Sequence, residues 1–178
     1  NKTMLRIDLA TPLAPKSSIS FTVKWWYYIN DRMAVGGRSG YEYFEKDKNY
    51  LYTLAQFFPR MCVYSDVTGW QNKQFLGRGE FTLPFGNYEV SITVPSDHII
   101  AATGECQNYQ EVLTSEQFNR WKLAQTATEP FEIVTLDEAK NKETYPSREK
   151  PYKIWKYKAT NVRDFAWGSS RKFTWDAM

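Results

Sequence analysis

The clearest strand signal in this chain is the alternating run Asn87-Tyr-Glu-Val-Ser-Ile-Thr-Val-Pro95. Side chains along a β-strand point to opposite faces in turn, so the apolar set should face a core and the polar set should face solvent. The inward set is Tyr88, Val90, Ile92 and Val94, and the outward set is Glu89, Ser91 and Thr93. One apolar and one polar face are typical of an antiparallel sheet that is covered on one side.

A second alternating run is Phe21-Thr-Val-Lys-Trp-Trp-Tyr-Tyr-Ile29. Its pattern predicts another strand, with Phe21, Val23, Trp25, Tyr27 and Ile29 on the core face. The opposite face then carries Thr22, Lys24, Trp26 and Tyr28, which places two aromatic rings among polar side chains. We therefore expect Trp26 and Tyr28 to be exposed.

Further short strands are predicted at 4–9, 50–55, 79–83, 99–106, 131–135, 152–159 and 172–175. The capping-box patterns Thr114-Ser-Glu-Gln117 and Thr135-Leu-Asp-Glu138 predict helices over 115–126 and 136–142. The polar stretch 140–150 has one proline and is expected to be a surface loop. Together these features predict one all-β domain over residues 1–178, mainly an antiparallel β-sandwich, with a helical and loop insertion at about 113–150.

The composition supports a folded domain with an unusual aromatic content. The chain has 178 residues, of which 7 are Trp, 12 Tyr and 11 Phe. The net charge is only +3, and no long basic run occurs, which argues against nucleic acid or an anionic membrane as the main partner. No apolar stretch is long enough for a membrane span. Because the first residue is Asn1, we expect an excised or processed piece of a longer protein.

Few residues of the chain could carry metal or nucleophilic chemistry. His98 is its one histidine, which excludes a two-histidine zinc helix, and Cys62 and Cys106 are too few for a cysteine-rich zinc site. Two free thiols are favoured over a disulfide between them. Glu45–Asn49 resembles the start of a calcium loop but lacks its later residues, and a charged hairpin turn is favoured. Gly36–Gly40 is expected to be a loop and Ser96–His98 a turn, so we predict no catalytic residue and no metal site.

The segment Leu54–Phe81 interleaves aromatic residues with amides and charges. Buried polar groups need hydrogen-bond partners, so this segment is either a salt-bridged connection or a recognition surface. Several of its motifs occur in a characteristic order with later ones. They are Ala55-Gln-Phe-Phe-Pro-Arg60, Asp66, Glu80-Phe-Thr-Leu83, Tyr88–Pro95, Ala101-Ala-Thr-Gly104 and Asn161-Val-Arg-Asp-Phe-Ala-Trp-Gly-Ser-Ser170.

In this order the motifs resemble the N-terminal, saddle-shaped β domain of the M1 family of zinc aminopeptidases, over most of the chain from Leu51 to Ala177. The resemblance implies that Gln56 faces the catalytic cleft and contacts the substrate near its N-terminal end. It also implies that zinc and the catalytic groups belong to a catalytic domain absent from this chain. Phe58 stands where the family usually has Glu. The alternative for Gln56 is a buried amide that satisfies a strand edge.

The resulting hypothesis is a non-catalytic domain that covers the cleft of an exported M1-like aminopeptidase, whether periplasmic, cell-surface or secreted. Its partners would be the missing catalytic domain and the peptide, and this piece should be inactive alone, with no cofactor of its own. A sheet edge left open by truncation on the N-terminal side could pair two copies. The alternative is a free-standing carbohydrate-binding or adhesion module. In either case the candidate interface or ligand aromatics are Trp26, Tyr28, Trp70 and Trp167.

Overall fold

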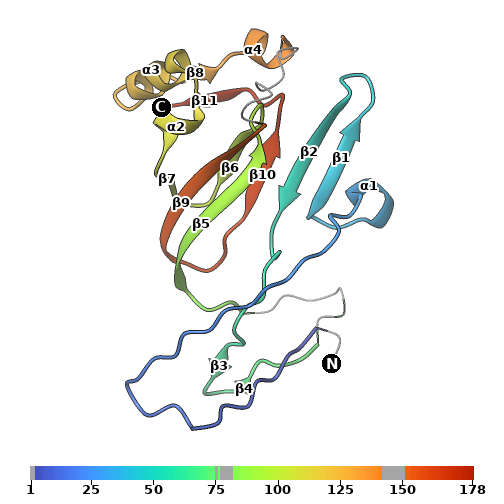
Figure 1. Ribbon diagram of the computed structural model, residues 1–178, viewed down its shortest axis with the longest axis vertical. Coiled ribbons are helices and arrows are strands. Elements are labelled where there is room, and N and C mark those ends of the chain that lie inside the picture. The colour runs from blue at the N-terminus through green and yellow to red at the C-terminus, as the bar shows by residue number, and fades with distance from the viewer. Residues whose placement is uncertain (1–2, 75, 77–81, 142–150) are drawn as a thin grey trace. The chain divides into compact units, whose positions relative to one another are not determined.

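The computed structural model describes residues 3–74, 76, 82–141 and 151–178. It divides the chain into two units. The first unit combines Asn1–Tyr28 with Phe58–Pro84, and the second combines Ile29–Phe57 with Phe85–Met178. The strands and their antiparallel pairing confirm an all-β fold with a short helical insertion (Figure 1).

The larger sheet of the second unit has four strands in the order β1-β2-β10-β6. Their bounds are β1 Gly40–Phe44, β2 Asn49–Leu54, β6 Ile99–Ala102 and β10 Trp167–Ser170. The hairpin β1–β2 pairs Gly40 with Thr53 and Phe44 with Asn49. Strand β10 comes late in the chain but lies between β2 and β6. It therefore brings the motif around Trp167 beside the segment that precedes Gln56.

The second sheet has three strands in the order β5-β9-β7. They are β5 Gly86–Pro95, β9 Tyr152–Val162 and β7 Glu105–Cys106. Figure 1 shows β5 and β9 lying across β6 and β10. The Tyr157 hydroxyl of β9 donates a hydrogen bond of 3.1 Å to the Ile100 carbonyl of β6, so the two sheets are connected directly.

The remaining elements are short. The second unit adds helices α1 Arg32–Val35, α2 Tyr109–Val112, α3 Ser115–Ala124 and α4 Leu136–Lys140, and the strand pair β8 Phe131–Val134 with β11 Trp175–Ala177. The first unit contains the strand pair β3 Tyr64–Ser65 with β4 Gly69–Trp70. No helix among the described residues is both long and apolar enough to cross a membrane.

Every buried residue in the described part of the chain belongs to the second unit. Its largest fully buried side chains include Trp155, Phe165, Ile133 and Val134. In β5 the burial pattern alternates as predicted, with Ile92 and Val94 buried and Ser91 and Thr93 exposed. The described residues of the first unit include no buried side chain, so this described part contains no core.

The predicted strand Phe21–Ile29 is wrong. These residues form no strand, and the described residues contain no partner strand that pairs with them. Trp25 and Tyr27, expected on a core face, are 49% and 45% exposed. Alternation alone does not make a strand, because its backbone groups also need a neighbouring strand. The predicted strand at 4–9 is wrong for the same reason.

Other predicted boundaries shift or lie outside the described residues. The run 99–106 is split into β6 and β7 at Gly104, whose φ is 85°. The last strand begins at Trp175, after a turn at 171–172. Part of the predicted strand 79–83 and most of the loop 140–150 fall on residues 79–81 and 142–150, which the structure does not describe. The sequence did not predict β1, β10, α1 or α2.

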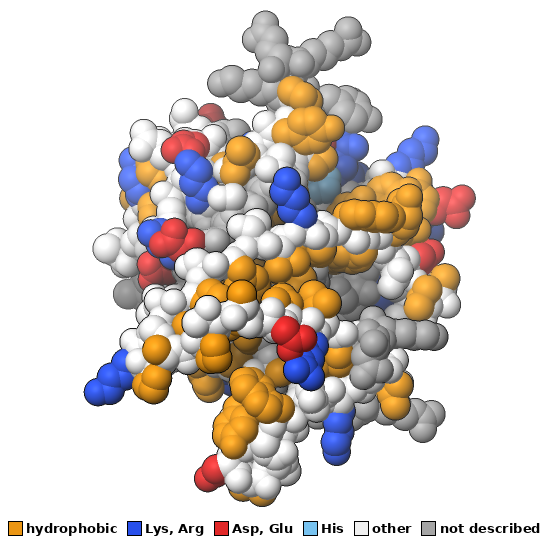
Figure 2. All heavy atoms as spheres, turned by 60° about the horizontal axis from the view of Figure 1, so that its bottom comes forward, with side chains coloured by type: hydrophobic (Ala, Val, Ile, Leu, Met, Phe, Trp, Pro, Cys, Tyr) orange, Lys and Arg blue, Asp and Glu red, His pale blue; other side chains and the backbone are white. Residues whose placement is uncertain are grey.

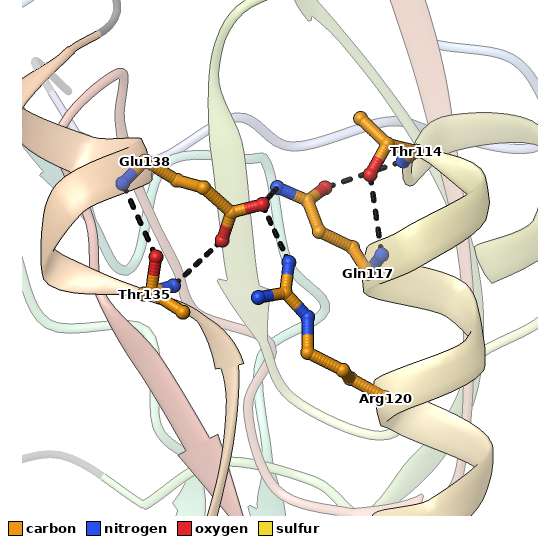
Figure 3. A network of polar contacts seen from close by, with 5 residues as sticks. All are labelled: Thr114, Gln117, Arg120, Thr135 and Glu138. Carbon is orange, nitrogen blue, oxygen red and sulfur yellow. Dashed lines mark hydrogen bonds and ion pairs between the residues drawn. The ribbon is translucent and has the colours of Figure 1, made fainter.

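Both predicted capping boxes are confirmed, and they are linked to each other (Figure 3). Thr114 pairs with Gln117 at the start of α3, and Thr135 pairs with Glu138 at the start of α4. The Glu138 carboxylate also accepts hydrogen bonds from Gln117 and Arg120 of α3. One carboxylate therefore caps its own helix and ties it to the preceding one.

Glu138→Gln should lower the free energy of unfolding by about 1 kcal/mol at pH 7. Burial alone raises the pKa of Glu138, but hydrogen bonds from Thr135 and the Arg120 guanidinium outweigh it and leave the pKa lowered. The ionised form therefore contributes stability above the pKa of the unfolded chain, about 4.3, and this contribution is lost as pH falls through the folded pKa. Urea unfolding at pH 7 and pH 3 should show the difference between wild type and variant shrinking. Glu132→Gln, at an exposed position of β8, is the control, and an equal effect there would contradict the assignment.

Candidate functional site

Gln56 lies just beyond the end of β2, at a bend, and its side chain is exposed. Its φ is 52°, in the left-handed region that residues other than glycine rarely adopt. This conformation costs about 1 kcal/mol or more and persists only where the surroundings impose it. The alternative of a buried amide at a strand edge is therefore not what the structure contains.

The residues before Gln56 are held by Ser39. The Ser39 hydroxyl accepts a hydrogen bond from the Ala55 N–H at 3.2 Å and donates to the Thr53 carbonyl at 3.3 Å. A single side chain thus closes the end of β2, where ladder pairing stops. The bend at Gln56 therefore follows directly after a residue, Ala55, whose backbone is held by Ser39.

Trp167 is the first residue of β10 and pairs with Leu54 of β2 and Ala102 of β6. Its ring meets the Phe57 ring edge to face, with centroids 6.2 Å apart. It is partly buried, and its indole Nε1 is buried with no hydrogen-bond partner among the described residues. Trp167 therefore lies, partly buried, on an inner strand of the larger sheet.

Trp26, Tyr28 and Trp70 belong to the first unit. Trp26 and Tyr28 are 80% and 83% exposed and meet edge to face with centroids 5.5 Å apart. Trp70 is 59% exposed and packs in the same manner on Tyr64 at 5.3 Å. Hydrophobic side chains reach the surface in several patches in Figure 2. The structure thus places Trp167 against Leu54 and Phe57, close to Gln56 in the sequence, and brings Trp26 together with Tyr28.

Three motifs have the structural roles that the sequence indicated. Glu45–Lys48 forms the turn of the β1–β2 hairpin, and Gly36–Gly40 connects α1 to β1. Ser96–His98 is the turn between β5 and β6. Within the described ranges no three His, Cys, Asp or Glu side chains gather to hold a metal ion.

The His98 turn belongs to a buried polar cluster that the sequence did not indicate. His98 Nδ1 lies 2.8 Å from the Ser169 hydroxyl, and the Asn49 amide donates to Ser170 at 2.9 Å. Asp97 pairs with Arg171 at 3.0 Å. Ser169 is only 1% exposed, so its hydroxyl cannot reach a substrate, and the cluster serves the fold.

The sequence analysis also did not identify a cluster of four tyrosines. Tyr41 and Tyr43 of β1 lie directly opposite Tyr52 and Tyr50 of β2, and their rings are in contact. Burial, with smaller contributions from Tyr50 and Tyr41, raises the pKa of Tyr52. The Tyr52 phenol is therefore neutral at physiological pH. The signal available in the sequence was tyrosine at alternate positions on both sides of the 45–48 turn.

A cavity of about 220 Å³ lies beside β6 in the second unit. Its lining is mostly apolar, with two tyrosines, and burial raises the pKa of Tyr109 to about 12. The pKa of Tyr157 is raised for the same reason, and its hydroxyl already donates to Ile100. The described residues that line it carry no charged side chain.

Both cysteines are free thiols, as the sequence favoured. Burial raises the pKa of the Cys106 thiol, although hydrogen bonds from the Asn108 and Lys156 backbone act in the opposite direction. A thiol is a nucleophile mainly as the thiolate, so Cys106 is poorly suited to covalent catalysis.

Comparison with models of known protein families, with curated proteins and with solved structures found no match. The geometry leaves Gln56 on its bend as the candidate site. The exposed aromatic residues of the first unit are a second candidate surface.

Proposed function

We propose that this chain is a non-catalytic β domain of an exported M1-like zinc aminopeptidase, here called the parent enzyme. In this proposal the chain covers the active-site cleft of a catalytic domain and contributes Gln56 to recognition of the peptide N-terminus. The all-β antiparallel fold is compatible with the resemblance that its motifs carry.

The observation that carries the proposal is the apolar surface of the first unit. Its described residues bury no side chain, yet they expose large hydrophobic groups such as Trp26, Tyr28, Val67, Trp70 and Leu76. Each such group left in water forgoes about 1.5–3 kcal/mol of burial free energy. Large exposed apolar groups are a feature of interaction sites, and a catalytic domain of the same protein is a partner that would cover them.

The chemistry of Gln56 suits the proposed contact. A carboxamide both donates and accepts hydrogen bonds without carrying charge, so it can hold a peptide backbone group without repelling an α-ammonium. Its exposed position on a fixed bend leaves it available to a ligand. The zinc would be held by residues of the catalytic domain, since the described part of this chain offers no cluster of ligands.

The full-length parent enzyme should bind zinc and release N-terminal residues from peptides, whereas this chain alone should do neither. Gln56→Ala in the parent should lower kcat/KM about 10-fold, the effect of losing one hydrogen bond to substrate. Gln107→Ala removes an exposed amide elsewhere in the chain and should leave kcat/KM unchanged. Stoichiometric zinc or turnover in the isolated chain would refute the proposal. Hydrogen exchange in the first unit should be faster in the isolated chain than in the parent.

The exposed Trp26–Tyr28 pair favours a second candidate, a carbohydrate-binding or adhesion module, because sugar rings stack on aromatic faces. Glycan-array binding by this chain that is lost in Trp26→Ala would support the module. Absence of glycan binding, together with faster exchange of the first unit in the isolated chain than in the parent, would favour the peptidase domain.

A further inference from the structure

We propose that Trp167 is a positioning residue that holds Gln56 in its left-handed conformation and so presents the carboxamide to the ligand. This inference rests on the proposed function for the identity of the ligand, a peptide N-terminus. It replaces the expected role of Trp167 as an exposed ligand or interface aromatic.

Trp167 contacts the chain on both sides of Gln56. Its backbone is paired with Leu54, two residues before, and its ring meets Phe57, one residue after. The only residues between these two contacts are Ala55 and Gln56, and the Ala55 N–H is already bonded to Ser39. The path between the two contacts is therefore short and fixed at both ends, which is the situation that imposes a strained conformation.

Trp167 is itself immobilised by its neighbours. Its strand has partners on both sides, β2 and β6. The preceding residue, Ala166, makes three hydrogen bonds with Thr103. The Thr103 N–H and hydroxyl donate to the Ala166 carbonyl at 3.0 and 3.3 Å, and the Ala166 N–H donates to the Thr103 hydroxyl at 3.1 Å. A side chain on such a frame can fix the position of a neighbouring bend.

The strain at Gln56 is not offset by any contact of its own side chain. The side chain is exposed, and among the described residues no hydrogen bond engages its carboxamide. Glycine would adopt the same φ without strain. A glutamine at this position is therefore explained by an interaction outside the chain, which is where the proposed peptide contact lies.

The test combines backbone measurements on this chain with kinetics of the full-length parent enzyme. On this chain, Gln56→Gly should raise Tm by about 2–4 °C because it removes the strain. NMR couplings that report φ should keep their left-handed values at Gln56 in Trp167→Phe and lose them in Trp167→Ala. Phenylalanine preserves the ring contact with Phe57, and the indole N–H that it removes has no partner in the described chain.

In the parent enzyme, Gln56→Gly should raise KM about 10-fold with kcat unchanged, because a contact made equally in the ground and transition states affects binding alone. Trp167→Ala should raise KM in the same way, whereas Trp167→Phe should change KM less than about 2-fold. The double variant Gln56→Gly with Trp167→Ala should have a KM no higher than that of Gln56→Gly alone. If Trp167→Ala does not fold, Phe57→Leu removes the ring contact while keeping Trp167. It should likewise raise KM and leave kcat unchanged.

Additive losses in the double variant, or an unchanged Gln56 φ in Trp167→Ala or Phe57→Leu, would overturn the positioning role. A lower Tm of Gln56→Gly would contradict the inference that the backbone is strained at Gln56. If the parent enzyme lacks aminopeptidase activity, the proposed function fails, while the φ couplings still decide whether Trp167 holds Gln56.

Discussion

Asn108→Ala is expected to lower the free energy of unfolding by about 3 kcal/mol, because it leaves two backbone groups of β9 without partners. Asn108 is 6% exposed, and its side chain continues the pairing of β9 where β7 ends. Its Nδ2 donates to the Ile154 carbonyl at 2.9 Å, and its Oδ1 accepts from the Lys156 N–H at 2.9 Å. One amide thus replaces a strand residue while the backbone turns away into α2.

Urea unfolding with hydrogen exchange at the Lys156 amide measures this effect. Asn108→Asp keeps an acceptor for Lys156 but places a carboxylate against the Ile154 carbonyl, so it should be at least as destabilising at pH 7. Gln107→Ala, at the exposed neighbouring position, should change stability by less than about 0.5 kcal/mol. If Asn108→Ala matched Gln107→Ala, the proposed pairing role would be wrong.

Gly104→Ala should lower the free energy of unfolding by about 3 kcal/mol or more, although the residue is exposed. Gly104 has φ 85°, and a Cβ added there would lie 2.2 Å from the Lys158 carbonyl oxygen and 2.7 Å from the Ala159 Cβ. Both are parts of β9 that cannot move without disturbing its pairing with β5 and β7. The β6–β7 connection must therefore shift as a whole.

Gly36→Ala is the matched control for Gly104→Ala. Gly36 has φ 80°, but no atom lies within 4 Å of its added Cβ. It should therefore show only the conformational cost of alanine at positive φ, about 1 kcal/mol. Thermal unfolding of both variants separates this cost from the steric one, and equal losses would show that close approach of β9 is unimportant.

Local patterns predicted the elements whose stability is largely local. The β5 run and the two capping boxes were found because alternation and a hydroxyl with a partner three residues later are sequence-adjacent features. Phe21–Ile29 has an equally regular pattern and forms no strand. The two runs differ in whether a partner strand is present, because β5 pairs with β9 over nearly its whole length. Sequence alternation contains no information about such a neighbouring strand.

The candidate site divides in the same way. Gln56 was implied only by the resemblance to a known family, whereas alternation indicated Trp26 and Tyr28 as exposed rings, and the structure leaves both rings exposed. The contacts of Trp167 with Leu54 and Phe57, on either side of the left-handed bend at Gln56, join positions more than a hundred residues apart. No local pattern could predict that juxtaposition, because it depends on β10 entering the sheet beside β2.

The amino-acid sequence by itself therefore determined the fold class, the strand β5 and the starts of α3 and α4, because each follows from side chains near one another along the chain. Only the tertiary structure decided which strands pair, that Asn108 replaces a strand residue, and that the first unit leaves its aromatics in water. The physical reason is that hydrogen-bond pairing and burial are satisfied between distant segments, and the free energy of each segment depends on the partner that it finds.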